Sequence, residues 1–249
     1  MYMNKERLFK DYRSYLSTAG LHEVFAVDYI AKLGERYGLD VYRFRDKLVA
    51  LVRHGDEFDI SFGANVIVSH LDSPRLDVLV GEPLVEKEDG VFLKVIPYGG
   101  IIPQSWLDIP LVLVGRIYTD EEPIIINTTG EFEFTITSLL PHLDGRKELE
   151  KFSMNNLVVR IGNSKKENIL ELLKERYGIH EDDFELADLS FIPATQVREL
   201  GFDKDLITGY GHDDSCCAFT SLQALLDSES NAKTQIAIFA SYEETGSNQ

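Results

Sequence analysis

Hydrophobic positions along the chain follow a helical spacing in three places. In residues 20–37 they recur every three or four residues, at Leu21, Val24, Phe25, Val27, Ile30 and Leu33. Residues 165–177 (KKENILELLKERY) are amphipathic in the same way. A third pattern follows Asp213 and Asp214, with Phe219, Leu222, Leu225 and Leu226 on one face. We therefore expect three helices, the first ending near Gly38 and the last beginning at the two aspartates, which suit a helix N-terminus.

Short apolar runs predict the strands. A β-branched run at 66–68 lies in ANVIVSHLDSPRLD and stops at a polar loop with Pro74. TQIAIFASYEE (234–244) predicts a buried strand that ends in carboxylates, and FELADLSFIPA (184–194) predicts another. Between about residues 78 and 140, many β-rich pieces are separated by Gly, Pro or Asn, which is typical of antiparallel structure.

These elements predict an α/β fold. The simplest organisation is an α/β domain in two sequence pieces, residues 1–78 and 188–249, interrupted by a β-rich insertion over residues 79–187. A chain of 249 residues is long enough for one large domain or two smaller ones.

Composition narrows the classes of partner. The chain has 25 Lys and Arg against 42 Asp and Glu, a net charge of −17, which argues against a nucleic-acid partner or an anionic membrane surface. No apolar run approaches the roughly 20 residues of a membrane span, and the charged start lacks a secretory signal. Two adjacent cysteines, Cys216 and Cys217, rule out a disulfide framework, so we expect a cytoplasmic protein.

Candidate metal ligands stand at the ends of two predicted strands and at the start of a helix. His70 and Asp72 lie at the end of the first strand, Asp213 and Asp214 open the helix, and Glu243 and Glu244 follow the last strand. Ligand sites in open α/β sheets form at the carboxyl ends of strands. One histidine with several carboxylates suits zinc or another divalent first-row ion, and Asp72 is placed to accept the second N–H of the imidazole.

The adjacent Glu243 and Glu244 offer two different roles. One carboxylate can bind a metal while its neighbour takes a proton from the water that the metal activates. Each motif alone is more often loop or capping chemistry, and the hypothesis rests on their combination.

The same segments resemble the aspartyl aminopeptidase family of di-zinc metallopeptidases. VSHLDSPRL is similar to the family's H-T-D-S-P-x-L, and YGGIIPQSWLDIPLVLVGRI to its Y-G-G-G-x-x-x-x-W-x-D-R-D-L-x-L-A-G-R-V. LLPHL resembles I-P-H-L, GYGHDDSCCAFTSLQALLD resembles R-L-D-N-x-x-x-x-x-x-A-L-x-A-L, and ASYEETGSNQ resembles D-N-E-E-V-G-S-x-x-x-Q-G-A. The matches run in the family's order from about residue 66 onward.

The resemblance implies a role for each residue. His70 corresponds to a ligand of one metal ion, Asp213 to the carboxylate that bridges both ions, and Glu244 to a ligand of the other. Glu243 corresponds to the general base and Asp72 to the residue that orients the histidine. The implied cofactors are two divalent ions, zinc foremost, with cobalt or manganese as alternatives.

The resemblance also has implications for the fold and the assembly. It implies a zinc-peptidase-type α/β sandwich, a cis peptide between Asp213 and Asp214, and a β-rich insertion that serves as a dimerisation domain. Peptides are the implied substrates, and homo-oligomers of tetrahedral shape the implied assembly.

Several positions depart from the family pattern. Ile109 and Pro110 replace an Arg and an Asp, Asp214 replaces an Asn, and Arg146 stands where many members have a second histidine. The family's further Asp and His ligands have no counterpart in these 249 residues, which hold three of five protein ligands.

Three functions remain open from the sequence. The chain is interpreted as a metallo-aminopeptidase, with an incomplete homologue that acts only as an assembly subunit as the alternative. Another di-metal hydrolase, such as a carboxypeptidase or deacylase, is the third.

The remaining residues of interest are interpreted as structural. Cys216 and Cys217 are expected to be buried and inert, Trp106 to lie in a core or interface, and YGGIIP not to bind a nucleotide. The other histidines are interpreted as structural or solvent-facing, with His212 of interest because it adjoins Asp213.

Overall fold

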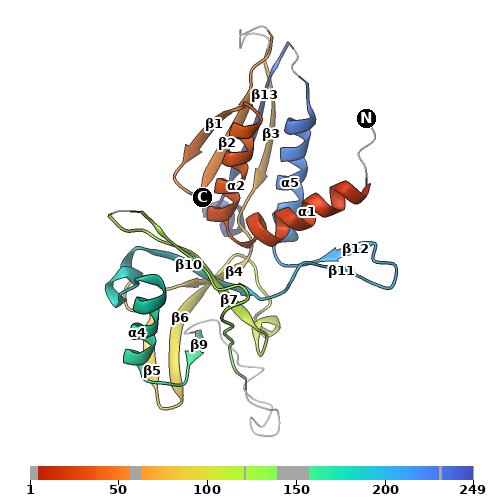
Figure 1. Ribbon diagram of the computed structural model, residues 1–249. Helices are drawn as coiled ribbons and strands as arrows, with labels where there is room; N and C mark the ends of the chain where they lie inside the picture. The colour runs from red at the N-terminus through yellow and green to blue at the C-terminus, as the bar shows by residue number, and fades with distance from the viewer. Residues whose placement is uncertain (1–4, 57–62, 121, 139–156, 230–231, 249) are drawn as a thin grey trace. The chain divides into compact units, whose positions relative to one another are not determined.

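The structure is a computed structural model that describes residues 5–56, 63–120, 122–138, 157–229 and 232–248 (Figure 1). The chain forms two compact units. Unit 1 comprises Met1–Ser73 and Gln196–Gln249, and unit 2 comprises Pro74–Thr195. From the sequence we placed the boundaries after residues 78 and 187. The strands near these points, β4 (Arg75–Val78) and β10 (Ala187–Pro193), pair with each other and with strands of unit 2.

Unit 1 is an α/β unit built on a sheet with the strand order β1-β2-β13-β3 in the described part of the chain. Strands β1 and β2 pair antiparallel, as do β2 and β13, whereas β13 and β3 run parallel. Figure 1 shows α2 and α5 on the same side of this sheet. The elements of unit 1 are α1 (Lys5–Thr18), η1 (Ala19–Leu21), α2 (Glu23–Arg36), β1 (Asp40–Phe44), β2 (Leu48–Arg53), β3 (Ala64–His70), β11 (Arg198–Leu200), β12 (Leu206–Thr208), α5 (His212–Asp227), β13 (Thr234–Ala240) and η5 (Glu243–Asn248).

Helix α2 begins and ends where the sequence provides terminating signals. His22 has an extended backbone, and its Nδ1 atom accepts the N–H of Val24 at 3.3 Å, so it caps the helix. The helix ends at Arg36, ahead of Gly38, whose φ of +67° is the left-handed conformation that glycine adopts readily. The pattern predicted one helix over 20–37, and the structure divides that segment at His22 into η1 and α2.

One face of the unit 1 sheet packs into the core. Val49, Leu51, Ala237 and Phe239 alternate along β2 and β13 and are buried against apolar side chains of α2 and α5. The helix side of that core consists of Ala26, Val27, Ile30, Ala31, Ala218, Phe219, Leu222, Leu225 and Leu226. Burying such side chains is the main term that stabilises the unit, at about 25 cal/mol per Å² of apolar surface.

Unit 2 is the β-rich unit. Its main sheet has the order β5-β6-β4-β10-β7-β8, with β9 paired to β6, and its strand pairs are antiparallel in the described residues. Trp106 is buried in its core, as the sequence indicated. The further elements of unit 2 are β5 (Leu84–Lys87), β6 (Gly90–Tyr98), η3 (Pro103–Trp106), β7 (Leu111–Ile117), β8 (Ile124–Asn127), β9 (Val158–Gly162), α4 (Lys166–Tyr177) and η4 (Glu181–Leu186).

Two local features differ from the sequence-based expectation. The strand predicted over 184–194 begins only at Ala187, because Asp183 accepts the N–H of His180 at 2.7 Å and this capping favours the short helix η4. The hairpin of β1 and β2 was not predicted at all.

LLPHL, His142 and Arg146 lie outside the described residues. Within the described residues, no helix has the length and apolar character of a membrane span.

Candidate metal centre

The carboxyl ends of β3 and β13 meet at one edge of the unit 1 sheet. The two strands run parallel, with His70 paired to Ala240, so the residues that follow them leave the sheet side by side. Asp72 follows β3 by two residues, and Glu243 and Glu244 open η5 shortly after β13. The sequence predicted this arrangement from the strand ends.

The Nε2 side of the His70 imidazole faces the carboxylates of α5 and η5. Its Nε2 atom lies 3.4 Å from Oδ1 of Asp213, 3.7 Å from Oε2 of Glu243 and 3.9 Å from Oδ2 of Asp214. Ligand atoms of His70, Asp213 and Asp214 lie within 4.8 Å of one another, and so do those of His70, Glu243 and Glu244. Helix α5 therefore supplies one half of the cluster and η5 the other, with His70 common to both.

Asp72 is the fully buried member of the site. Its two carboxylate oxygens accept the backbone N–H groups of Glu243 at 3.3 Å and of Glu244 at 3.1 Å. The Nδ1 atom of His70 lies 3.0 Å from the main-chain carbonyl of Asp72 and 3.4 Å from its carboxylate. The nearer acceptor for the imidazole is thus the carbonyl, whereas the carboxylate holds the backbone of the two glutamates.

The start of α5 is tied to the end of β3. The backbone N–H of His70 donates to Oδ2 of Asp214 at 3.2 Å, and the Ser73 hydroxyl donates to the carbonyl of Asp213 at 2.6 Å. The Asp213–Asp214 peptide bond is cis, as the resemblance implied. The side chain of Asp213 remains 82% exposed, whereas that of Asp214 is largely buried.

The local environment raises the pKa of the Glu244 carboxyl. Burial is the largest cause, and the negative charge of Asp213 raises it further, while His70 acts in the opposite direction. A crowded acidic cluster of this kind is stabilised by a cation, because the carboxylates repel one another.

The sequence did not identify every contributor to the site. The sequence placed Asp214 beside Asp213 at the start of a helix, among the segments that carry candidate ligands, but it predicted no contact for Asp214, and Ser73 was not singled out. Both act through contacts between segments about 140 residues apart in the chain, at separations of 144 for His70–Asp214 and 140 for Ser73–Asp213. The one available signal was their place in the two motifs, HLDSP and GHDDS.

The cysteine prediction was wrong in one respect. Cys216 and Cys217 are free but exposed, because the core-facing positions of α5 are Ser215, Ala218 and Phe219. A hydrogen bond with Asp214, with burial as the next cause, raises the pKa of the Cys217 thiol to about 11, which makes it a weak nucleophile at neutral pH. The Nδ1 atom of His212 is hydrogen-bonded to the Tyr12 hydroxyl at 2.8 Å, and His212 is not a member of the candidate ligand cluster.

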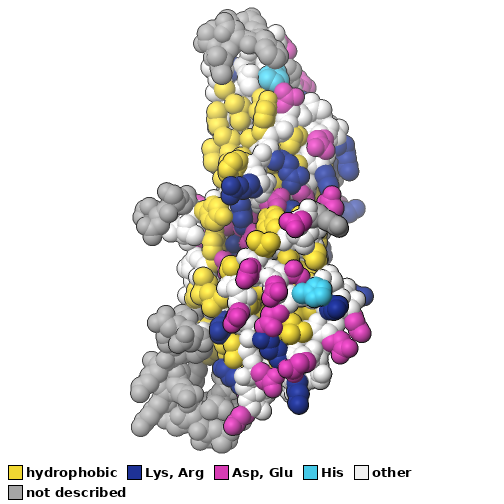
Figure 2. Space-filling model, turned by 90° about the vertical axis from the view of Figure 1, so that its left-hand side faces the viewer, with side chains coloured by type: hydrophobic (Ala, Val, Ile, Leu, Met, Phe, Trp, Pro, Cys, Tyr) yellow, Lys and Arg dark blue, Asp and Glu magenta, His cyan; other side chains and the backbone are white. Residues whose placement is uncertain are grey.

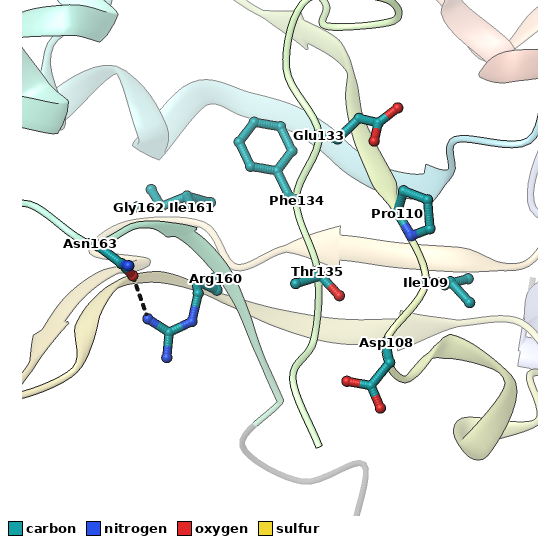
Figure 3. A pocket seen from close by; sticks show the side chains of 10 residues that line it. All are labelled: Asp108, Ile109, Pro110, Glu133, Phe134, Thr135, Arg160, Ile161, Gly162 and Asn163. Carbon is teal, nitrogen blue, oxygen red and sulfur yellow. Dashed lines mark hydrogen bonds between the residues drawn. The ribbon is translucent and has the colours of Figure 1, made fainter. Parts of the chain in front are cut away.

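Unit 2 contains a separate pocket of about 560 Å³ (Figure 3). Two of its polar side chains are visibly hydrogen-bonded or anchored: Arg160 donates to Oδ1 of Asn163, another lining residue, at 2.8 Å (Figure 3). Asp108 accepts the backbone N–H of Ser138, which does not line the pocket, at 2.9 Å. Ile109 and Pro110, which depart from the family pattern, line this pocket. None of the candidate metal ligands lines it.

Comparison with known proteins gives consistent matches. Residues 35–249 match the family model of aminopeptidase I zinc metalloproteases (M18). The probable M18 family aminopeptidase 1 of Thermotoga maritima is 40% identical over 230 residues, covering 86% of this chain and 50% of that protein. The counterpart from Borreliella burgdorferi B31 is 35% identical over 274 residues, covering 98% of this chain and 59% of that protein. The chain therefore spans about half the length of the curated relatives that it matches.

Solved structures agree with the fold. The crystal structure of the M18 aminopeptidase from Thermotoga maritima superposes with a TM-score of 0.88 at 34% identity, covering 100% of this chain and 61% of that chain. Aminopeptidase I from Borrelia burgdorferi B31 gives a TM-score of 0.83 at 31% identity, covering 98% and 64%. These matches confirm the zinc-peptidase-type α/β fold expected from the sequence.

Proposed function

Because the chain belongs to the M18 family of aminopeptidase I zinc metalloproteases, we propose that it carries the metal-binding part of a metallo-aminopeptidase. Such an enzyme releases residues one at a time from the N-termini of peptides. The observation that supports this proposal most strongly is the convergence of His70, Asp213, Glu243 and Glu244 at the carboxyl ends of β3 and β13.

The donor set fits two divalent ions. An imidazole nitrogen with several carboxylate oxygens, all within 4.8 Å in each group, is a combination that zinc accepts. His70 would hold one ion, Glu244 the other, and Asp213 both. Bound zinc supplies a Lewis acid that polarises the scissile carbonyl and makes water a stronger acid.

Glu243 is the proposed general base. Its side chain is exposed and close to His70, so its carboxylate is accessible to a water molecule and to substrate. As the water oxygen attacks the carbonyl carbon, Glu243 takes the proton. It then gives that proton to the leaving amine as the carbon–nitrogen bond breaks. The products are a free amino acid and a peptide shortened by one residue.

The surrounding carboxylates also suit a peptide with a free α-amine. At neutral pH the amine carries a positive charge, and an acidic cluster attracts it. This feature favours an aminopeptidase over a carboxypeptidase or a deacylase with the same arrangement of metal ligands. The substrates of a carboxypeptidase or a deacylase present a carboxylate or an acylated nitrogen, respectively, near the scissile bond.

The proposal is tested on protein that includes the remainder of the family's length, loaded with zinc, cobalt or manganese. Hydrolysis of aminoacyl-nitroanilides in preference to N-acyl amino acids is expected. Turnover of the acylated compounds alone would favour a deacylase, and no turnover of either would end the catalytic proposal.

Replacing each of the two glutamates by glutamine in turn separates their roles. Glu243→Gln is expected to lower kcat by about 100-fold or more with metal content unchanged, because the base is lost and the ligand is kept. Glu244→Gln is the matched variant and is expected to lower metal content instead. Equal loss of metal in Glu243→Gln, measured by elemental analysis, would show that the two roles are reversed.

A second candidate function is an assembly subunit without catalysis. Two observations favour it. The chain spans about half the length of its relatives, and the candidate ligand cluster at the ends of β3 and β13 contains a single histidine among the described residues. This alternative would be supported if the 249-residue chain had no activity with any of the added metals but assembled with a complete family member into the same oligomer.

Unit 2 is the proposed self-association domain. Its β-rich composition supports this, as do several exposed apolar side chains, among them Ile96, Ile102 and Ile125. The yeast aminopeptidase 1, a structure described as a dodecamer, shares the fold at 16% identity and a TM-score of 0.80. Light scattering of the purified protein tests the proposal, and a tetrahedral assembly of dimers is the expected form.

A further inference from the structure

Helix α1 contacts the first residue of α5. The hydroxyl of Tyr12 and the Nδ1 atom of His212 are hydrogen-bonded at 2.8 Å, although the two residues are 200 positions apart in the sequence. The Tyr12 ring also lies against the rings of His212 and Phe219, with centroid distances of 5.8 Å and 5.3 Å. His212 directly precedes Asp213, so this contact reaches the segment that carries a candidate metal ligand.

The Tyr12 hydroxyl is the polar anchor of the His212 ring. Burial is the largest of the causes that raise the pKa of this hydroxyl above its ordinary value, so it keeps its proton at neutral pH. A neutral phenol donates to Nδ1 in one neutral tautomer of the imidazole and accepts from it in the other. The other ring nitrogen, Nε2, is buried and has no hydrogen-bond partner among the described residues. The orientation of the ring therefore depends on Tyr12.

The backbone at the start of α5 does not have regular helical geometry. Gly211 has a φ of +79°, and Asp213 has a φ of −88° with a ψ of 113°. The first turn of a helix has backbone groups that the helix itself does not satisfy, so its geometry depends on contacts with other segments. The Ser73 hydroxyl holds the carbonyl of Asp213 at 2.6 Å, and Tyr12 holds the preceding residue, His212.

The position of the Asp213 carboxylate follows from this backbone. Its side chain is 82% exposed, so few protein atoms restrain it directly. Exposed carboxylates are common on this protein, and Figure 2 shows Asp and Glu side chains spread over the face that it draws. Asp213 differs from a freely moving surface carboxylate because its own carbonyl and the preceding side chain are both anchored. Neighbours that fix a metal ligand raise metal affinity, and losing one typically costs about 10–100-fold.

The other polar contacts of α1 do not involve α5. Arg13 pairs with Glu199 at 2.8 Å and Lys5 with Asp205 at 3.2 Å, and both exposed pairs connect α1 to the segment of β11 and β12. A pocket of about 290 Å³ lies between α1, β12 and α5. Helix α1 lies beside the end at which α5 begins (Figure 1), and the Tyr12 hydrogen bond is the polar contact between them there.

We propose that α1 positions Asp213 at the metal centre through the hydrogen bond between Tyr12 and His212. Both are positioning residues, because neither is a member of the candidate ligand cluster and their effect passes through the backbone of Asp213. The inference rests on the proposed function, which makes Asp213 a ligand of both ions. It gives a part in the metal site to a helix, Lys5–Thr18, that precedes the portion matched by the family model, residues 35–249.

Hydrogen exchange on the metal-free 249-residue chain tests the restraint itself. Tyr12→Phe removes the hydroxyl and keeps the aromatic ring in the core. The backbone N–H of Ser215, which donates to the carbonyl of Gly211 at 3.3 Å, is expected to exchange at least about fivefold faster in this variant. Arg13→Met is the matched control, because it removes a contact of α1 that does not involve α5, and it should leave the exchange of Ser215 unchanged.

Cobalt binding tests the consequence, in protein that includes the remainder of the family's length. Tyr12→Phe and His212→Leu are each expected to weaken cobalt affinity about tenfold and to change the visible absorption of the bound cobalt, which reports ligand geometry. The double variant should bind no more weakly than either single variant, because both remove the same hydrogen bond. His212→Asn offers an amide in place of Nδ1 and should keep the affinity within about twofold. Circular dichroism should show the parent fold in each variant.

Three results would overturn the inference. The first is unchanged exchange of Ser215 in Tyr12→Phe. The second is cobalt affinity and absorption equal to those of the parent in both single variants. The third is an effect of Arg13→Met as large as that of Tyr12→Phe, since general docking of α1 would then be the cause. A parent protein that binds no cobalt would end the proposed function, whereas the exchange measurement uses no metal and decides the restraint by itself.

Discussion

The buried carboxylate of Asp72 joins the two strands that end at the metal centre. It follows β3 by two residues and accepts the backbone N–H groups of Glu243 and Glu244, which follow β13. The peptide groups from which the proposed base and ligand extend are thereby fixed to the strand that carries His70. Asp72 is therefore a positioning residue, and its effect on the reaction passes through the residues that it holds.

Replacing Asp72 tests this function at the level of stability. Asp72→Ala leaves two N–H groups without their acceptor and is expected to lower the free energy of unfolding by about 2–6 kcal/mol, at about 1–3 kcal/mol for each group. Asp72→Asn keeps one acceptor oxygen and should lose about half as much. Urea titration followed by circular dichroism measures both changes, with Asp227→Ala as an exposed control on α5. A loss in Asp72→Ala no larger than in the control would contradict the assignment.

At the scale of elements, the N-terminus of α2 is held to the turn between β1 and β2 by an ion pair. Glu23 is fully buried and accepts from the Lys47 ammonium at 2.8 Å, and its other oxygen lies 3.5 Å from Nδ1 of His22. The negative charge also lies in the first helical turn, where the helix dipole favours it. The buried charge thus connects the start of α2 to the turn of the hairpin that follows this helix.

Lys47→Met is expected to destabilise unit 1 by about 3 kcal/mol, because it leaves the buried Glu23 without that counter-charge. The double variant Glu23→Gln/Lys47→Met should recover much of this loss. Lys32→Met is the matched control, because Lys32 is exposed on α2. The single tryptophan, Trp106, lies in the core of unit 2, so its fluorescence can report that unit separately while circular dichroism follows the whole chain.

Within unit 2, the pairing of β7 with β10 depends on Gly115. Its φ is +130°, and a Cβ atom there would lie 2.1 Å from the carbonyl oxygen of Asp188. Gly115→Ala is therefore expected to cost about 3 kcal/mol, against about 1 kcal/mol for Gly130→Ala, where φ is also positive but the space is open. The Trp106 fluorescence transition in urea measures both. Equal losses would show that backbone strain, rather than the contact with Asp188, sets the cost.

At the scale of the whole molecule, the sequence predicted features that depend on order along the chain. His70, Asp213, Glu243 and Glu244 each follow a strand or open a helix, so the elements alone indicated that they could meet. The link from Asp214 to the backbone of His70 was not predictable, because it requires the folded distance between distant segments. The hairpin of β1 and β2 was missed because Asp40, Arg43 and Arg45 interrupt the alternation in DVYRFRDKLVALVR.

The metal content of the chain by itself follows from how many ligands it carries. The resemblance assigns His70, Asp213 and Glu244 to three of five ligand positions, and it implies an Asp and a His as the other two, which have no counterpart in these 249 residues. Each ion would therefore have two protein ligands here, with Asp213 shared, whereas zinc sites in proteins use three or four.

Calorimetric titration of the 249-residue chain with zinc should show binding at least about 100-fold weaker than in protein that includes the remaining part. His70→Ala should abolish the remaining zinc binding. His54→Ala is the control and should leave zinc binding unchanged, because His54 lies outside the cluster, with its Nε2 atom 2.7 Å from Oδ2 of Asp40. Two tight zinc sites in the 249-residue chain would mean that its own carboxylates, Asp214 among them, complete the coordination.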